Sequence, residues 1–118
     1  MCGIAGLIDQ SRGELVSTLE KMVASIRYRG PDDSGIWTDR SSGVGLGHAR
    51  LSILDLSPEG HQPMVSHSGQ YVFSYNGEVY NFAELRSELE ATGKKFRGHS
   101  DTEVMLAAFE IWGVEKSL

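Results

Sequence analysis

The sequence predicts an α+β domain in which helices pack on antiparallel strands. Residues 3–8 are a short run of small and β-branched side chains, which is typical of a buried strand. Apolar side chains then recur at helical spacing over residues 14–28, and glycine-punctuated, β-rich segments follow before two further helices. This order of strand, helix, several strands and two helices makes an α+β domain the natural class.

The first helix is expected over residues 14–28, and one apolar stripe defines it. The stripe consists of Leu15, Leu19, Met22, Val23 and Ile26. Gly30 and Pro31 predict where the helix stops, because glycine tolerates a left-handed cap and proline cannot continue a helix.

Three strands are expected in the middle of the chain, at residues 34–38, 44–54 and 71–75, with a turn at 39–43. Residues 57–68 hold two prolines and are expected to form a loop.

Two capping boxes predict the starts of the last two helices. Asn81 is followed three residues later by Glu84, and Ser100 is followed by Glu103 at the same spacing. Glycines at positions 93 and 113 predict where these helices end.

Composition excludes several classes of function. The 118 residues predict one domain, and the net charge of −5 argues against a nucleic-acid partner. No apolar run reaches the length of a membrane span, so no membrane partner and a cytoplasmic location are expected. One cysteine and four scattered histidines predict no metal site. The glycines at 43, 45 and 47 do not match a dinucleotide fingerprint, so no cofactor is expected in this chain.

Cys2 is the first candidate for catalysis. Initiator methionine is generally removed before a small residue, which would leave Cys2 with both a thiol and a free α-amine. An α-amine has a reference pKa of about 7.7 to 8.0, so it can accept the thiol proton directly or through a water. Nucleophile and base then occupy one residue. The alternative is that Cys2 is only a small apolar group at the start of a strand.

Asn76 and Gly77 allow two interpretations. Asn-Gly between strand-like segments is the commonest signal for a hairpin turn. The same pair could instead donate a side-chain amide and a backbone N–H to a developing oxyanion. Local sequence favours the hairpin.

Two charged residues are candidates for binding a charged group of a ligand. Arg50 lies among strand-forming residues, and its guanidinium matches a carboxylate in bidentate fashion, although Asp55 is an equally simple structural partner. Asp101 could bind an amine, or could complement the positive end of the helix that begins there.

Six motifs occur in one order along nearly the whole chain: MCGIAG at 1–6, RGPDDSG at 29–35, GHARLSILDL at 47–56, QPM at 62–64, YNGEVYN at 75–81 and GHSDTE at 98–103. Together they resemble the glutamine-hydrolysing domain of the N-terminal-nucleophile amidotransferases (class II, or type 2), most closely that of asparagine synthetases. The resemblance implies an N-terminal-nucleophile hydrolase fold, with two antiparallel sheets layered between helices.

The resemblance also implies roles for particular residues. Cys2 would attack the glutamine amide and form a thioester, with Asn76 and the Gly77 N–H holding the oxyanion. Arg50 would bind the substrate α-carboxylate, and Asp101 would bind its α-ammonium with help from Glu78. The backbone of Leu51, Ser52, Ile53 and Leu54 would line the glutamine pocket.

The chain is shorter than the family domain that it resembles, so residues 1–118 are interpreted as its N-terminal part. The ATP-dependent synthetase domain, with its SGGxDS loop, is not in the sequence, so ATP and magnesium are expected only there, in cis in the full protein. Uncovered sheet surface in the isolated chain allows oligomers, including a homodimer. Two alternatives stay open, namely amidation of a sugar in surface-polysaccharide synthesis and a truncated module that binds without catalysis.

Overall fold

A computed structural model describes residues 1–11, 13–53 and 56–118. The chain divides into two compact units. The N-terminal unit consists of Met1–Ser52, His61–Pro63 and Ser74–Asn76. The C-terminal unit consists of Ile53–Gly60, Met64–Phe73 and Gly77–Leu118. Both units combine antiparallel strands with helices, which confirms the predicted α+β class.

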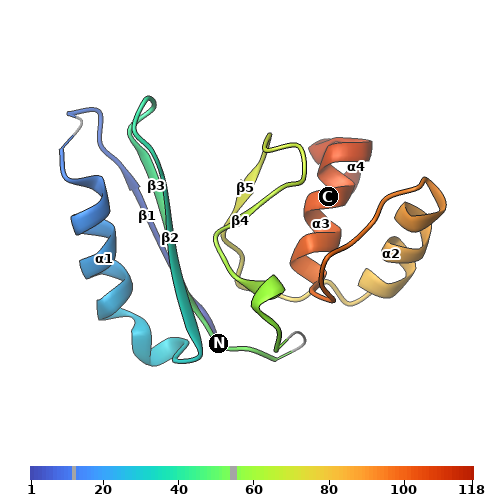
Figure 1. The fold of residues 1–118 in the computed structure, drawn as a ribbon, viewed down its shortest axis with the longest axis horizontal. Helices are drawn as coiled ribbons and strands as arrows, with labels where there is room; N and C mark the ends of the chain where they lie inside the picture. The colour runs from blue at the N-terminus through green and yellow to red at the C-terminus, as the bar shows by residue number, and fades with distance from the viewer. Residues whose placement is uncertain (12, 54–55) are drawn as a thin grey trace. The chain divides into compact units, whose positions relative to one another are not determined.

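The N-terminal unit is a three-stranded antiparallel sheet with one helix on it (Figure 1). Its strands are β1 (Gly3–Ile8), β2 (Asp33–Asp39) and β3 (Val44–Arg50), in the order β1-β3-β2. The helix is α1 (Leu15–Ser25). The central position of β3 pairs Ala49 with Gly3 on one side and Arg50 with Asp33 on the other.

Glycines on β3 let α1 lie close to the sheet. A Cβ atom at Gly45 would meet the Leu19 side chain at 2.4 Å, and one at Gly47 would meet Val23 at 2.5 Å. Leu19 and Val23 are buried there, as the apolar stripe predicts. The helix therefore packs against the backbone of the strand that ends at Arg50.

The end of α1 corrects the expectation for Gly30. The helix stops at Ser25, a 3-10 helix follows at Arg27–Arg29, and Gly30 has a φ of −150°, which is not left-handed. A Cβ atom at Gly30 would lie 2.2 Å from the carbonyl oxygen of Ala49. Glycine is needed at this position for close approach to β3 and not for a cap.

The strand predicted over residues 44–54 is too long, because β3 ends at Arg50. After Arg50, side chains and not a neighbouring strand accept the backbone hydrogen bonds. The Leu51 N–H donates to Cys2 Sγ, and the Ser52 N–H donates to Asp32 Oδ2. Residues 54 and 55 lie outside the described part of the chain.

The C-terminal unit holds a two-stranded hairpin and helices (Figure 1). Strand β4 (Met64–Val65) pairs with β5 (Val72–Phe73), so the loop predicted over 57–68 is wrong in part, and the strand predicted over 71–75 is shorter than expected. That loop also contains a 3-10 helix at Pro58–Gly60. The helices are α2 (Phe82–Ala91), α3 (Asp101–Trp112) and α4 (Val114–Ser117). Of these three, the short α4 was not predicted from the sequence.

The core of the C-terminal unit lies between α2 and α3. Its buried residues are Leu89, Val104, Ala107 and Ala108. Partly buried apolar side chains surround them, and these include Phe82, Leu85, Phe96 and Trp112. The predicted ends of both helices are confirmed, because Gly93 and Gly113 have positive φ angles of 94° and 84°.

Only one of the two predicted helix caps forms. Ser100 Oγ accepts the backbone N–H of Glu103 at 3.2 Å at the start of α3. The Glu103 carboxylate binds the N–H groups of Arg97 and Gly98 and so closes the preceding loop. Asn81 precedes α2 but makes no side-chain capping bond. The prediction of a capping box at Asn81 is therefore wrong.

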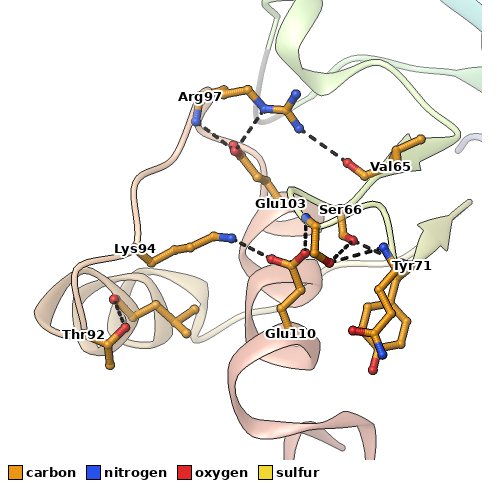
Figure 2. A network of polar contacts seen from close by, with 11 residues as sticks. Val65, Ser66, Tyr71, Thr92, Lys94, Arg97, Glu103 and Glu110 are labelled. Carbon is orange, nitrogen blue, oxygen red and sulfur yellow. Dashed lines mark hydrogen bonds and ion pairs between the residues drawn. The ribbon is translucent and has the colours of Figure 1, made fainter.

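A polar network joins the β4–β5 hairpin to α3 within the C-terminal unit (Figure 2). Glu110 on α3 accepts the Ser68 N–H and the Lys94 ammonium, each at 2.6 Å. Partial burial raises the pKa of the Glu110 carboxyl, but the hydrogen bonds from Lys94 and Ser68 outweigh burial and lower the pKa to about 2.

Replacing Glu110 with glutamine is expected to lower the free energy of unfolding by about 1–3 kcal/mol at pH 7, because two bonds to a largely buried charge weaken. The native pKa lies below 4.5, the ordinary value for a glutamate side chain, so this stabilisation is present above pH 4.5 and is lost as the pH falls from there toward 2. Urea unfolding at pH 7 and pH 3 tests this, with exposed Glu115→Gln as the control. An equal deficit at both pH values would contradict it.

Candidate active site

Cys2 lies directly before β1 and is partly buried. Its Sγ accepts the Leu51 N–H at 3.3 Å and lies 3.6 Å from the Leu51 carbonyl oxygen, to which the S–H donates. Arg29 Nε donates to the Cys2 carbonyl oxygen at 3.3 Å. The thiol is therefore held where β3 ends, beside the residue that follows Arg50.

Arg50 is the last residue of β3 and only 7% of it is exposed. Its cross-strand partner is Asp33, the first residue of β2. Partial burial raises the pKa of the Asp33 carboxyl, but the hydrogen bond and charge of His61 and the positive charge of Arg50 bring the pKa below its usual value. Arg50, which carries the guanidinium, and Leu51, which contacts the Cys2 thiol, are therefore consecutive residues.

His48 lies two residues before Arg50, so both side chains are on the same face of β3. Burial, together with the nearby positive charge of Arg50, lowers the pKa of His48 to about 4, so its ring is neutral at pH 7. Nδ1 lies 3.0 Å from Ser74 Oγ, while Nε2 has no hydrogen-bond partner among the described residues.

Asn76 is exposed and belongs to the N-terminal unit. The hairpin interpretation of Asn76 and Gly77 is wrong, because the described residues between Gly77 and α2 form no strand. The chain passes instead from β5, through an irregular segment, into α2. Asn76 and Gly77 therefore do not form a hairpin turn.

Asp101 is buried at the first position of α3, in the C-terminal unit. Its Oδ2 accepts the Val79 N–H at 2.9 Å, which fixes the segment just after Glu78. Glu78 is exposed. Asp101 therefore serves at least one structural purpose, in agreement with its place in the first turn of a helix.

The predicted site residues are distributed over both units. Five belong to the N-terminal unit: Cys2, Arg50, Leu51, Ser52 and Asn76. Four belong to the C-terminal unit: Ile53, Gly77, Glu78 and Asp101. Leu54 lies outside the described residues. Cys2 and Leu51 are in direct contact, and Arg50 is the neighbour of Leu51 in sequence.

Two buried polar residues near these positions were not singled out from the sequence. The alternation of side chains along β3 could have placed His48 beside Arg50, since they are two residues apart. Gln62 carried no local signal beyond its place in the QPM motif. Its 7% exposure and its bond to the Tyr75 N–H emerge only in the folded chain.

Metal ligands do not gather anywhere in the described part of the chain. Within those residues there is no group of three or more His, Cys, Asp or Glu side chains that could hold a metal ion. The described helices include none that is long and apolar enough to span a membrane.

Comparison with known proteins identifies the family. The family model of the glutamine amidotransferase domain matches residues 1–118. Asparagine synthetase [glutamine-hydrolyzing] 3 of Bacillus subtilis is 42% identical over 117 residues, covering 95% of this chain and 18% of the relative. A putative asparagine synthetase [glutamine-hydrolyzing] 2 of Methanocaldococcus jannaschii is 35% identical, covering 98% of this chain and 25% of the relative.

A third relative has a different name. Amidase chry2 of Gibberella zeae is 38% identical over 125 residues, covering 97% of this chain and 18% of the relative. The chain thus spans between 18% and 25% of the length of these three relatives. Since the family model covers all 118 residues, the resemblance seen in the sequence is confirmed: the chain belongs to the glutamine amidotransferase domain family, and is homologous to the glutamine-hydrolysing part of asparagine synthetases.

Proposed function

We propose that this chain hydrolyses glutamine to glutamate and ammonia, with Cys2 as the nucleophile once Met1 has been removed. The observation that carries the proposal is the placement of the Cys2 thiol against Leu51, directly after the buried Arg50. The proposed nucleophile thus lies against the residue that follows Arg50, and the Arg50 guanidinium, which matches a carboxylate, belongs to the same unit.

The reaction follows from the groups on Cys2 itself. The α-amine of Cys2 takes the thiol proton, and the thiolate attacks the carboxamide carbon of glutamine. The Asn76 side-chain amide and the Gly77 N–H donate to the oxyanion of the tetrahedral intermediate. The protonated amine then gives its proton to the leaving nitrogen, so ammonia departs and a thioester remains. Water hydrolyses the thioester to glutamate and restores the thiol.

Substrate selection rests on the two charged ends of an amino acid. Arg50 pairs with the α-carboxylate, and Asp101 pairs with the α-ammonium with assistance from Glu78. The backbone of Leu51, Ser52 and Ile53 is proposed to line the glutamine pocket. A primary amide without these charged ends would form neither ion pair, so we expect it to be a much poorer substrate.

The ammonia is used by a further domain in this proposal. The two matched asparagine synthetases have roughly four to five and a half times the length of this chain, since it spans 25% of one and 18% of the other. We place an ATP- and magnesium-dependent synthetase domain in cis in the full protein, with activated aspartate as the ammonia acceptor. A cytoplasmic location suits a catalytic thiol, which must stay reduced.

The assay measures glutamate and ammonia released by the purified chain from glutamine, with asparagine and acetamide as matched substrates. Equal molar amounts of both products are expected from glutamine, and at least about 100-fold slower release from acetamide, which lacks both charged ends. Absence of glutamine hydrolysis, or equal rates on all three amides, would overturn the proposed function.

A further inference from the structure

We propose that Gln62 is a positioning residue that holds Asn76 in place to stabilise the oxyanion. The inference rests on the proposed function, because it concerns the same reaction. Gln62 carries out no step of that reaction itself. It acts through the backbone of Tyr75, the residue before Asn76.

The first observation is a buried hydrogen bond. Gln62 is 7% exposed, and its Oε1 accepts the backbone N–H of Tyr75 at 2.7 Å. Strand β5 has already ended at Phe73, so Tyr75 is outside the strand ladder. The Gln62 side chain therefore accepts the backbone hydrogen bond that a neighbouring strand would accept within a sheet, and it does so one residue before Asn76.

The second observation is that the loop carrying Gln62 is anchored to β2. His61 Nδ1 lies 2.7 Å from Asp33 Oδ2 at the start of that strand. Gly35 leaves room for the loop, since a Cβ atom there would be 2.4 Å from the Gln62 carbonyl oxygen. Gln62 therefore extends from a fixed support and can act as a rigid acceptor.

The third observation is that β3 holds the same segment from another side. Ser74 Oγ donates to the Gly47 carbonyl oxygen at 3.3 Å and lies 3.0 Å from Nδ1 of the neutral His48 ring. The backbone that leads to Asn76 is thus tied to β2 through Gln62 and to β3 through Ser74. The residue that follows β3 is Leu51, which contacts the Cys2 thiol.

The chemical consequence follows from when an oxyanion donor acts. Its hydrogen bond strengthens only as charge develops, so its misplacement slows the chemical step and leaves ground-state binding of glutamine unchanged. Loss of one such donor costs about 10²–10³ in kcat, and a misaligned donor is expected to lose part of that, about 10- to 100-fold.

The test compares Gln62→Met with the unaltered chain. Methionine keeps the length of the side chain but removes the acceptor, so kcat is expected to fall about 10- to 100-fold while KM for glutamine changes less than about twofold. Gln62→Glu restores an acceptor oxygen and should recover most of kcat. Gln10→Met, at an exposed glutamine of the same unit, is the control and should leave both parameters unchanged.

A double variant separates positioning from general structural damage. If Gln62 acts through Asn76, then Gln62→Met adds little further loss of kcat in an Asn76→Ala background. Should Gln62→Met fail to fold, Gln62→Asn retracts the acceptor by one methylene and should give the same pattern. Additive losses in the double variant, or an unchanged kcat in folded Gln62→Met, would overturn the inference. Inactivity of the unaltered chain would instead overturn the proposed function.

Discussion

Cys2→Ala is expected to abolish glutamine hydrolysis, with a fall in kcat of at least about 10⁴-fold and up to about 10⁶-fold. In the proposed reaction the thiolate is the group of the chain that forms a covalent bond to the substrate, and the alanine side chain offers no nucleophile in its place. Release of ammonia and of glutamate from glutamine, each measured against enzyme-free buffer, gives the rate.

Two controls distinguish loss of the nucleophile from loss of the fold. The Cys2→Ala chain should keep the circular-dichroism spectrum of the original and a similar thermal transition, because the substitution removes sulfur hydrogen bonds to Leu51 but leaves the pairing of β1 with β3 intact. Cys2→Ser should retain a small residual rate, since a hydroxyl is a weaker nucleophile than a thiol next to the same α-amine. Activity in Cys2→Ala within tenfold of the original would remove Cys2 from the mechanism.

Arg50→Gln is expected to raise KM for glutamine by about 10²-fold, because loss of a buried partner for the substrate carboxylate costs about 2–5 kcal/mol. A smaller effect on kcat is expected, since the carboxylate is bound in the ground state and in the transition state alike. Initial rates over a wide range of glutamine concentration separate the two parameters.

Arg50→Lys and Arg40→Gln are the matched variants. Lysine keeps the charge but loses the planar fork, so KM should lie between those of the original and of Arg50→Gln. Arg40 is exposed in the turn between β2 and β3, and its replacement should leave KM unchanged. An unchanged KM in folded Arg50→Gln would show that glutamine is held elsewhere.

The sequence predicted well those features that depend on local pattern. Strand β1 occupies residues 3–8 as expected, and Ser100 caps α3 because a hydroxyl three residues before Glu103 needs no tertiary partner. The apolar stripe around Leu19 faces the sheet because helical periodicity alone decides which side is buried.

Features that depend on distant partners could not be predicted from the sequence. Strand β3 ends at Arg50 because Cys2 and Asp32, far away in the chain, satisfy the next two N–H groups. Gly30 is required by the carbonyl of Ala49 and not by its own helix. Gln62 reaches Tyr75 across a folded loop, and no spacing rule links them.

The most direct test of Cys2 as an N-terminal nucleophile is the intact mass of the chain after incubation with a diazoketone analogue of glutamine. The proposal predicts that Met1 is absent and that one adduct, formed with loss of dinitrogen, is located on Cys2 by peptide mapping. Excess glutamine should slow its formation, and the Cys2→Ala chain should acquire none. Retention of Met1, or an equal adduct on Cys2→Ala, would contradict the account.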